Sequence, residues 1–296
     1  MPSPITPDML RAWPLPMPSP DGDKEARGHA LIIGGSAQMP GAVLLAANAA
    51  LRAGAGKLSV ASPACAALAL GIALPEARVC GLAETAQGGL VLEHSAALTW
   101  SGEVDAILIG PGMCDEAATI ALVRQLLAHL AAHKPEIPVI LDAMAMKAVG
   151  ADVGLHAHLL LTPHAGELAG LSGAEKDDIA AAPEPAAREA ARRWQATVAL
   201  KGALTIIANP AGETWSHQGG NVGLAISGSG DALAGIIVGL AARGAPLAQA
   251  ACFGVAVHAA AGEQLAQRVG PLGYLAREIA DEVAARLCAL LPDDAA

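Results

Sequence analysis

The chain has 296 residues, of which 53% are hydrophobic and 2% aromatic, and its formal net charge at pH 7 is −10. A chain of this length and apolar content can bury a substantial core, which excludes global disorder. The negative charge repels phosphate backbones and the few aromatic rings leave little for bases to stack on, so we expect no nucleic-acid partner.

The cysteines and the apolar stretches indicate a cytoplasmic protein without a membrane partner. The five cysteines lie far apart and form no CxxC pair, so neither a zinc site nor a disulfide framework is expected. The apolar stretches 28–51 and 244–262 are interrupted by glycine, proline and polar residues, unlike membrane spans. The first ten residues lack a basic segment and contain Asp8, so we expect no signal peptide.

Residues 1–27 are rich in proline and charge and are predicted to form an arm over the surface, with a short helix at 7–13. A single catalytic domain is predicted for 28–296. Short apolar runs then alternate with alanine-rich stretches of helical length. The predicted strands are 29–33, 57–61, 106–109, 139–142 and 159–162, and the predicted helices are 41–53 and 116–133. This alternation is typical of βαβ units around a parallel sheet that is buried on both faces.

The second half of the chain changes pattern. A charged helical region at 174–195 precedes short strands at 197–200, 205–208 and 214–217, whose close spacing favours antiparallel hairpins at one sheet edge. Helices are predicted at 231–243, 247–269 and 274–290. We find no internal repeat and no interdomain linker. The predicted fold is therefore one three-layer α/β/α domain with a mostly parallel central sheet and an antiparallel edge.

The strongest local motif is glycine-rich. Gly220-Asn221-Val222-Gly223 is followed by Ser227-Gly228-Ser229-Gly230-Asp231 and then by an apolar helical run. Glycines let backbone N–H groups converge on an anion, and a helix N-terminus adds its own N–H groups, so a phosphate can bind there. Asp231 is placed to accept a proton from an attacking hydroxyl. Taken alone, the motif is equally consistent with a plain turn whose Asp favours the helix dipole.

Polar residues also follow several predicted strands, where the carboxyl ends of a doubly wound sheet bind ligands. They are Gly34-Gly35-Ser36, Gly110-Pro111-Gly112, Asp142, Thr162-Pro163-His164 and Lys201-Gly202. Each has a plainer interpretation. The glycines can make a tight turn, His164 can bond a loop carbonyl, Lys201 can be a solvated charge, and Asp142 can cap a helix rather than help to hold Mg²⁺.

Taken in order, these motifs resemble the NAD(P)H-hydrate dehydratases, ADP- or ATP-dependent repair enzymes of the ribokinase-like superfamily. The resemblance runs from residue 28 to the C-terminus. It rests on segments 28–36, 40–42, 52–57, 110–112, 162–164 with 166–167, 200–202 and 220–235. The last segment is shared with several small-molecule kinases, whereas the ordered set is much more specific. The resemblance implies a ribokinase-like fold.

The resemblance also implies roles for particular residues. The positions that match substrate contacts are Ala42, Gly112, His164 and Asp231, the last also catalytic. The positions assigned to the nucleotide are Lys201, Gly202, Ala203, Leu204, Thr205, Gly228, Ser229 and Gly230, with Asn221 and Asp142 in support. Two positions depart from the family pattern, because Met144 stands where a second acidic residue is frequent and Ser227 where glycine is usual. The metal ligands stay undefined.

The implied activity is the dehydration of the S epimer of hydrated NADH or NADPH, through phosphorylation of the ring hydroxyl and elimination of phosphate. The resemblance implies Mg²⁺ and either ADP or ATP as cofactors. It also implies that the protein forms a homotetramer and that a separate epimerase is its pathway partner. The sequence leaves open the choice of ADP or ATP and of NADH or NADPH. A small-molecule kinase, of hydroxymethylpyrimidine or hydroxyethylthiazole type, is the main alternative, and a nucleotide-binding regulator without catalysis is another.

Overall fold

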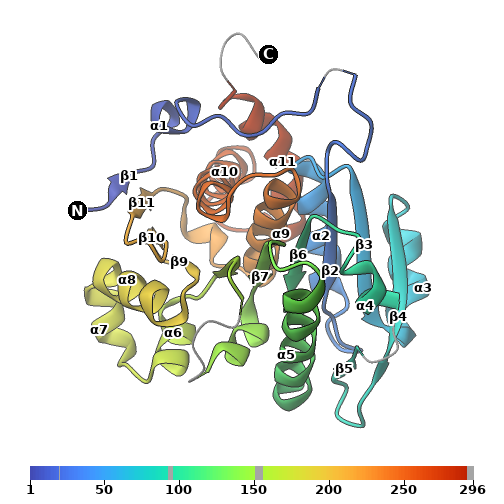
Figure 1. Ribbon diagram of the computed structural model, residues 1–296. Helices are drawn as coiled ribbons and strands as arrows, with labels where there is room; N and C mark the ends of the chain where they lie inside the picture. Colours follow the sequence, from blue (N-terminus) through green and yellow to red (C-terminus); the bar gives the residue numbers. More distant parts are fainter. Residues whose placement is uncertain (20, 93–95, 151–155, 292–296) are drawn as a thin grey trace.

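The computed structural model describes residues 1–19, 21–92, 96–150 and 156–291 (Figure 1). Its first half contains β1 (Ser3–Pro4), α1 (Pro7–Arg11), β2 (His29–Ile33), α2 (Gly41–Arg52), β3 (Lys57–Pro63), α3 (Ala64–Ala73), β4 (Ala77–Glu84), β5 (Leu90–Val91), α4 (Ala96–Trp100), β6 (Ala106–Ile109), α5 (Glu116–His133), β7 (Val139–Leu141) and the 3₁₀ helix η1 (Ala143–Val149). The second half contains β8 (Leu159–Leu161), α6 (Ala165–Ser172), α7 (Lys176–Ala181), α8 (Pro183–Trp194), β9 (Thr197–Leu200), β10 (Leu204–Ala208), β11 (Thr214–Gln218), the 3₁₀ helix η2 (Val222–Leu224), α9 (Ser229–Ala242), α10 (Leu247–Arg268) and α11 (Ala276–Cys288).

Within the described residues the strands form an 11-stranded sheet in the order β1-β11-β10-β9-β8-β7-β6-β2-β3-β4-β5. Strands β4, β3, β2, β6, β7, β8 and β9 are mutually parallel. Strand β10 runs antiparallel to both β9 and β11, and β5 runs antiparallel to β4. The predicted fold, a mostly parallel sheet with an antiparallel edge, is confirmed.

Alternate residues of the central strands supply two separate cores, one on each face of the sheet. In β2, Ala30 and Ile32 pack with α2, α9, α10 and α11, whereas Leu31 and Ile33 pack with α5, η1 and α8. Because both faces are covered, the strands read as continuous apolar runs. This burial explains why His29–Ile33 and Ala106–Ile109 have the bounds that the sequence predicts.

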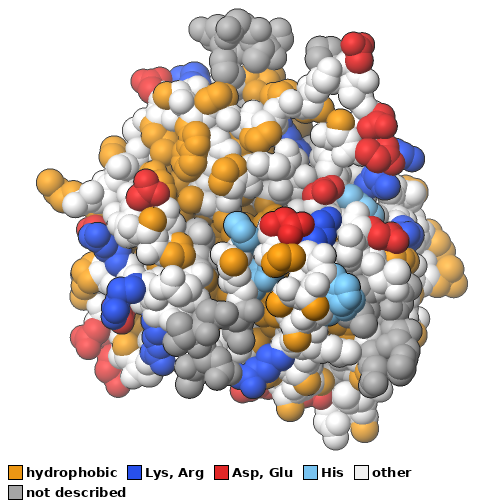
Figure 2. Space-filling model, in the orientation of Figure 1, with side chains coloured by type: hydrophobic (Ala, Val, Ile, Leu, Met, Phe, Trp, Pro, Cys, Tyr) orange, Lys and Arg blue, Asp and Glu red, His pale blue; other side chains and the backbone are white. Residues whose placement is uncertain are grey.

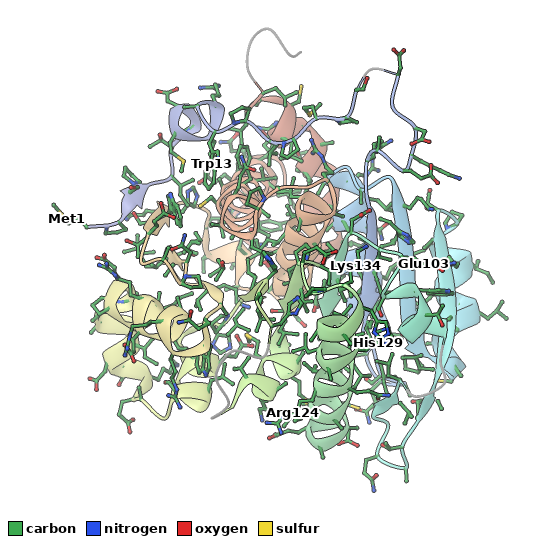
Figure 3. All side chains as sticks on the ribbon, in the orientation of Figure 1. Met1, Trp13, Glu103, Arg124, His129 and Lys134 are labelled. Atoms are coloured by element: carbon green, nitrogen blue, oxygen red, sulfur yellow. The ribbon has the colours of Figure 1, made fainter. Side chains whose placement is uncertain are left out.

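The arm of residues 1–27 contributes to the sheet, which the sequence did not predict. Its strand β1 pairs parallel with β11, and Ile5, Leu10 and Leu15 are buried in the core. Trp13 stacks on Trp215 of β11 with ring centroids 5.9 Å apart, and its carbonyl accepts a hydrogen bond from Gln249 of α10 (Figure 3). Hydrophobic side chains gather on this face over α1 and α10 (Figure 2). The arm is therefore anchored along the antiparallel edge.

Other differences from prediction are local. Residues 64–91 contain α3, β4 and β5, none of which was predicted, and α6 was also missed. The charged region 174–195 holds two helices, α7 and α8, rather than one helical run, because Pro183 begins a new helix. Among the described residues, no helix is both long and apolar enough to cross a membrane.

Helices α2 and α9 pack backbone to backbone through glycines. A Cβ on Gly235 would lie 2.2 Å from the carbonyl oxygen of Ala46, and one on Gly239 would lie 2.5 Å from that of Ala50. No rotamer change can relieve these contacts because backbone atoms make them. The helices are therefore held at a separation that only glycine allows.

Replacing Gly235 with Ala is expected to lower the free energy of unfolding by about 1–3 kcal/mol, although alanine is the better helix former. Urea denaturation measures the change. Gly170→Ala in α6 is the matched control, because a Cβ there meets no atom within 4 Å. The control is expected to be neutral or slightly stabilising. A Gly235→Ala variant as stable as wild type would show that the two helices separate at little cost.

Candidate active site

The parallel strands bring the predicted site residues to one edge of the sheet. Lys201, after β9, forms a bridge with His164, after β8, and its N–H donates to Pro163 O at 2.7 Å. The N–H of Asp142, after β7, donates to Ile109 O at 3.0 Å. Gly35, after β2, donates to Pro111 O at 2.6 Å. The carboxyl ends of these strands therefore form one continuous site.

Lys201 lies at the centre of a charged cluster. Its Nζ is 3.5 Å from Asp142 Oδ1 and 3.7 Å from Glu167 Oε2. The Asp142 side chain is 4% exposed, and its Oδ1 also accepts a hydrogen bond of 2.6 Å from the Thr162 hydroxyl. Asp142 precedes η1 but makes no side-chain cap there, so its carboxylate serves the cluster rather than the helix end. Glu167 and Thr162 thus join the site beside the predicted residues.

The first turn of α9 faces this cluster. Gly228 is its N-cap with φ +91°, a conformation that favours glycine, and a Cβ there would lie 2.4 Å from Leu45 Cδ1. A Cβ on Gly230 would lie 3.6 Å from Lys201 Nζ, so the lysine approaches the helix backbone closely. The first N–H groups of a helix have no intrahelical acceptor. Together with the Lys201 cation they make this end of α9 suitable for a phosphate.

Asp231, in the first turn of α9, has an unusual proton affinity. Burial raises its pKa to about 7, the negative charge of Asp142 adds to the rise, and Lys201 opposes it. A carboxyl group with a pKa near neutrality is well suited to general base catalysis, because it is ionised at working pH yet basic enough to take a proton. A carboxylate that only favours the helix dipole would have a lowered pKa, so the raised pKa of Asp231 does not fit a purely capping role.

His164 is fixed by the N-terminus of α6. Its Nδ1 accepts hydrogen bonds from Gly166 N at 3.0 Å and Glu167 N at 3.1 Å, and Glu167 Oε2 accepts one from His164 N at 2.8 Å. This capping box replaces the loop-carbonyl contact that the plainer interpretation predicted. Because Nδ1 accepts, the proton of the neutral ring is on Nε2. His164 can therefore offer a donor to a ligand.

Ala42 and Gly112 lie together beside the turn that follows β2. Gly112 has φ +69°, and a Cβ there would lie 2.5 Å from Met39 O and 2.9 Å from Ala42 Cβ. Gly35 is also close, since that added Cβ would lie 3.3 Å from its Cα. These small residues let a ligand approach the backbone at the start of α2. The structure thus brings together segments that are far apart in the sequence.

A cavity of about 900 Å³ opens beside the Lys201 cluster. The predicted residues that line it are His164, Lys201, Gly202, Ala203, Thr205, Asn221, Ser229 and Gly230. Ala42, Gly112, Asp142, Leu204, Gly228 and Asp231 do not line it, and of these Leu204 is exposed. Asn221 Oδ1 accepts from Gly223 N and from the Tyr274 hydroxyl, both at 2.9 Å, which fixes this wall.

His217 and His258 also line the cavity, and the sequence did not indicate them. His258 contacts Ser229, with Nε2 3.0 Å from Ser229 Oγ. Neither ring nitrogen of His217 has a hydrogen-bond partner among the described residues. Of the two departures from the family pattern, Met144 lies half-buried in η1 and Ser227 is exposed before the N-cap of α9.

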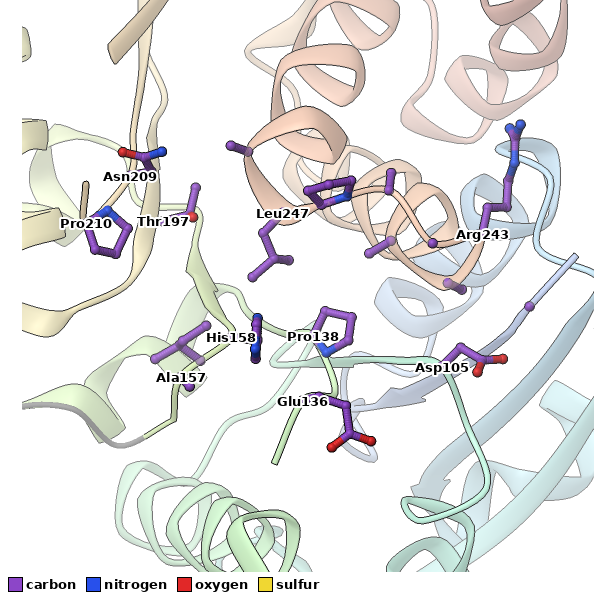
Figure 4. Close-up of a pocket in the computed structure, with 18 of the residues that line it drawn as sticks. Asp105, Glu136, Pro138, Ala157, His158, Thr197, Asn209, Pro210, Arg243 and Leu247 are labelled. Carbon is purple, nitrogen blue, oxygen red and sulfur yellow. The ribbon is translucent and has the colours of Figure 1, made fainter. Parts of the chain in front are cut away.

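A second cavity, of about 700 Å³, lies at the opposite edge of the sheet (Figure 4). Asp105, Pro138, His158 and Thr197 line it, and they stand at the amino ends of β6, β7, β8 and β9. None of the predicted site residues lines this cavity. The residues that the sequence predicts for the site therefore lie away from this second cavity.

The chain is similar to several known proteins. A family model described as NAD(P)H-hydrate dehydratase matches residues 30–285. An ADP-dependent (S)-NAD(P)H-hydrate dehydratase from Xanthomonas campestris is 48% identical over 280 residues, which are 94% of each chain. The crystal structure of the ADP/ATP-dependent NAD(P)H-hydrate dehydratase from Bacillus subtilis, co-crystallised with ATP and Mg²⁺, is 29% identical, with a TM-score of 0.82 over 97% of this chain and 98% of that one. A ribokinase-like superfamily protein from Enterococcus faecalis is 25% identical, with a TM-score of 0.84 over 98% and 96% of the chains.

Proposed function

The chain belongs to the NAD(P)H-hydrate dehydratase family, and from this premise we propose that it dehydrates the S epimer of hydrated NADH and NADPH with ADP as phosphoryl donor. The observation that carries the proposal is the position of Asp231. This carboxyl group, with a pKa of about 7, stands at the N-terminus of α9 beside Lys201 and Asp142. The arrangement suits the transfer of a phosphoryl group to a hydroxyl.

The proposed mechanism makes a poor leaving group into a good one. Asp231 takes the proton of the ring hydroxyl, whose oxygen attacks the terminal phosphorus of ADP and displaces AMP. Electron donation from the ring nitrogen then breaks the ring C–O bond and phosphate departs. Loss of a proton from the adjacent ring carbon restores NADH or NADPH. With ATP as donor, the same steps would release ADP instead of AMP.

The other site residues have proposed roles in binding. Lys201 and the N–H groups of Gly228 and Gly230 hold the phosphates, and the cavity beside them accepts the adenosine part of the nucleotide. Ser229 takes part through its hydroxyl, because its N–H already donates to Ile226 O at 3.2 Å. Gly202, Ala203 and Thr205, at the start of β10, border the same space, and Leu204 is exposed. Ala42 and Gly112 contact the hydrated nicotinamide, and His164, which also lines the cavity, offers its Nε2–H at the boundary between the two ligands. Asn221 and Asp142 support the two walls through their hydrogen bonds.

The residues at the site fit Mg²⁺ bound chiefly through nucleotide phosphates. The described residues include no group of three or more acidic, histidine or cysteine side chains that could hold a metal alone. The carboxylates nearest Lys201 are Asp142 and Glu167, and one or two carboxylates with phosphates are the usual ligands of Mg²⁺. When bound, the ion would neutralise phosphate charge. These two residues are the ones we propose to face it, directly or through water.

We also propose a cytoplasmic homo-oligomer, a tetramer by resemblance to the family. All described cysteines are free thiols, which suits a reducing compartment. Leu68 and Ile72 on α3 are 79% and 74% exposed, an apolar face that a second copy could cover. Because the Xanthomonas relative is named for the S form of its substrate, a separate epimerase is the expected partner that converts the R form.

The test is recovery of reduced-nicotinamide absorbance when the purified protein is mixed with NADH hydrate, Mg²⁺ and either ADP or ATP. The expected result is recovery with ADP, accompanied by one phosphate released for each NADH formed. A stable phosphorylated product without recovery would instead establish the small-molecule kinase. Nucleotide binding without any turnover would establish the regulatory alternative.

A further inference from the structure

The mechanism leaves one half-buried histidine, His258, without a role. His258 of α10 lies against the first residue of α9, with Nε2 3.0 Å from Ser229 Oγ and 3.1 Å from Ser229 O. Ser229 is 5% exposed, and both residues line the cavity of about 900 Å³. The contact joins two helices across 29 residues of sequence at the point where the phosphates of a nucleotide would lie.

The two contacts determine which ring nitrogen carries the proton. A carbonyl oxygen can only accept a hydrogen bond, so at 3.1 Å from Ser229 O the Nε2 atom must be a donor. Burial lowers the pKa of His258 to about 4, with a further lowering by the Lys201 charge that the hydrogen bond to Ser229 opposes. The ring is therefore neutral at pH 7. In a neutral ring with the proton on Nε2, Nδ1 is bare.

This tautomer decides what the serine hydroxyl can do. The Nε2–H points at both oxygens of Ser229, so Ser229 Oγ faces a donor on that side and cannot give its own proton to the ring. Among the described residues, Ser229 Oγ has no other hydrogen-bond partner. A buried hydroxyl is expected to donate to some acceptor. Because Ser229 lines the cavity, an acceptor bound there can take this proton.

The cavity has few positive charges, so a neutral hydrogen-bond donor such as the Ser229 hydroxyl matters for binding an anion there. Among the described residues that line it, Lys201 is the cationic side chain, while His258 is neutral. A nucleoside diphosphate brings several anionic oxygens, more than one lysine can satisfy. Hydroxyl and backbone N–H donors at the start of α9 can supply the rest.

From these contacts we propose that His258 is a positioning residue: it fixes the Ser229 hydroxyl as a hydrogen-bond donor to a phosphate of the bound nucleotide. The inference rests on the proposed function, because it places the nucleotide in this cavity. It goes beyond that function in assigning a role to a side chain on α10, which no local motif marks. Adenosine, which has no phosphate, should not use this bond.

The test compares His258→Leu, which fills the space without a donor, with His258→Gln, which keeps an N–H donor, and with Ser229→Ala. Calorimetric titration should show ADP binding weakened by roughly tenfold or more in His258→Leu and in Ser229→Ala, the range of a hydrogen bond to a charged group. Adenosine binding should be unchanged in both variants. His258→Gln should stay within about threefold of wild type. The double variant Ser229→Ala/His258→Leu should be no weaker than either single one, because one bond is removed.

Nitrogen-15 spectra of the unmodified protein test the same inference without nucleotide or mutation. The His258 ring should show a protonated Nε2 and a bare Nδ1 that do not change between pH 6 and 8. Any one of four results would overturn the positioning role. They are a proton on Nδ1, an equal loss of adenosine and ADP binding, additive effects in the double variant, and wild-type ADP affinity in His258→Leu. If the wild-type protein binds ADP but the variants or the spectra contradict the role of His258, only that role is overturned and the proposed function stands. If it binds no ADP, both fall.

Discussion

Asp231→Asn is expected to lower kcat/KM for hydrated NADH by about 100- to 10,000-fold, the usual contribution of a general base. Asparagine has nearly the same shape but cannot take the hydroxyl proton. The wild-type enzyme should itself lose activity as the pH falls below about 7, because protonation of Asp231 removes the base. Nucleotide-dependent recovery of absorbance, followed from pH 5 to 9, measures both effects. Wild-type turnover in the variant would remove Asp231 from the mechanism.

The same substitution should stabilise the fold above pH 7. The pKa of Asp231 is raised from 3.8 to about 7, so between these values the folded chain holds more protons than the unfolded chain. The free energy of unfolding therefore falls as the pH rises through this window and is level above it. At about 1.4 kcal/mol for each pKa unit, the asparagine variant gains up to about 4 kcal/mol at pH 8 and nothing below pH 4. Urea denaturation at the two pH values gives the difference, and equal stabilities at pH 8 would contradict the raised pKa.

Lys201→Met should weaken ADP binding by about 100-fold, because it removes the cation next to the proposed phosphate site. Methionine keeps the apolar stem but not the charge. Since Lys201 also opposes the rise in the Asp231 pKa, residual activity should require a higher pH than in wild type. Calorimetric titration with ADP and the pH profile of kcat/KM test the two effects.

Lys57→Met is the matched control for Lys201→Met. Lys57 pairs with Glu25 at the amino end of β3, away from the site, with Nζ 3.2 Å from Glu25 Oε1. The Lys57→Met substitution removes one positive charge, as Lys201→Met does, and should leave ADP binding and the pH profile unchanged. If both lysine variants weakened ADP binding equally, long-range charge rather than contact would be responsible.

The parts of the fold that could be predicted are those whose burial or capping produces a recognisable pattern in the local sequence. Strands β2 and β6 are continuous apolar runs because helices cover both faces, and α5 begins after Asp115, whose side chain accepts a hydrogen bond from Ala118 N. The two-residue strand β1 has no such sequence pattern, since it is a strand only because it pairs with β11. Pro183 marks the start of α8 in the sequence as well, since proline is favoured in the first turn of a helix.

The site, too, has parts that the local sequence predicts and parts that depend on contacts between distant segments. The glycine turn and Asp231 are contiguous in sequence and could be found there. The approach of Lys201 to Asp142 depends on β7, β8 and β9 being neighbours in the sheet, which follows once the strand order is known. The His258 contact with Ser229 crosses two helices. No local pattern in α10 indicates it, because an alanine-rich helix with one histidine is also an ordinary core helix.

The glycine contacts between α2 and α9 have a consequence for how two reactants meet. Helix α2 starts with Gly41 and Ala42, the latter a proposed substrate contact, and α9 starts with the glycine turn proposed to bind phosphate and with Asp231. Their backbones touch at Gly235 and at Gly239, so the two starting points cannot slide apart without separating main chains. The pair thus sets the span between hydroxyl and phosphorus before either molecule arrives. An enzyme built in this way needs no closing domain to align its substrates, and its selectivity should depend on which molecules fit that fixed span.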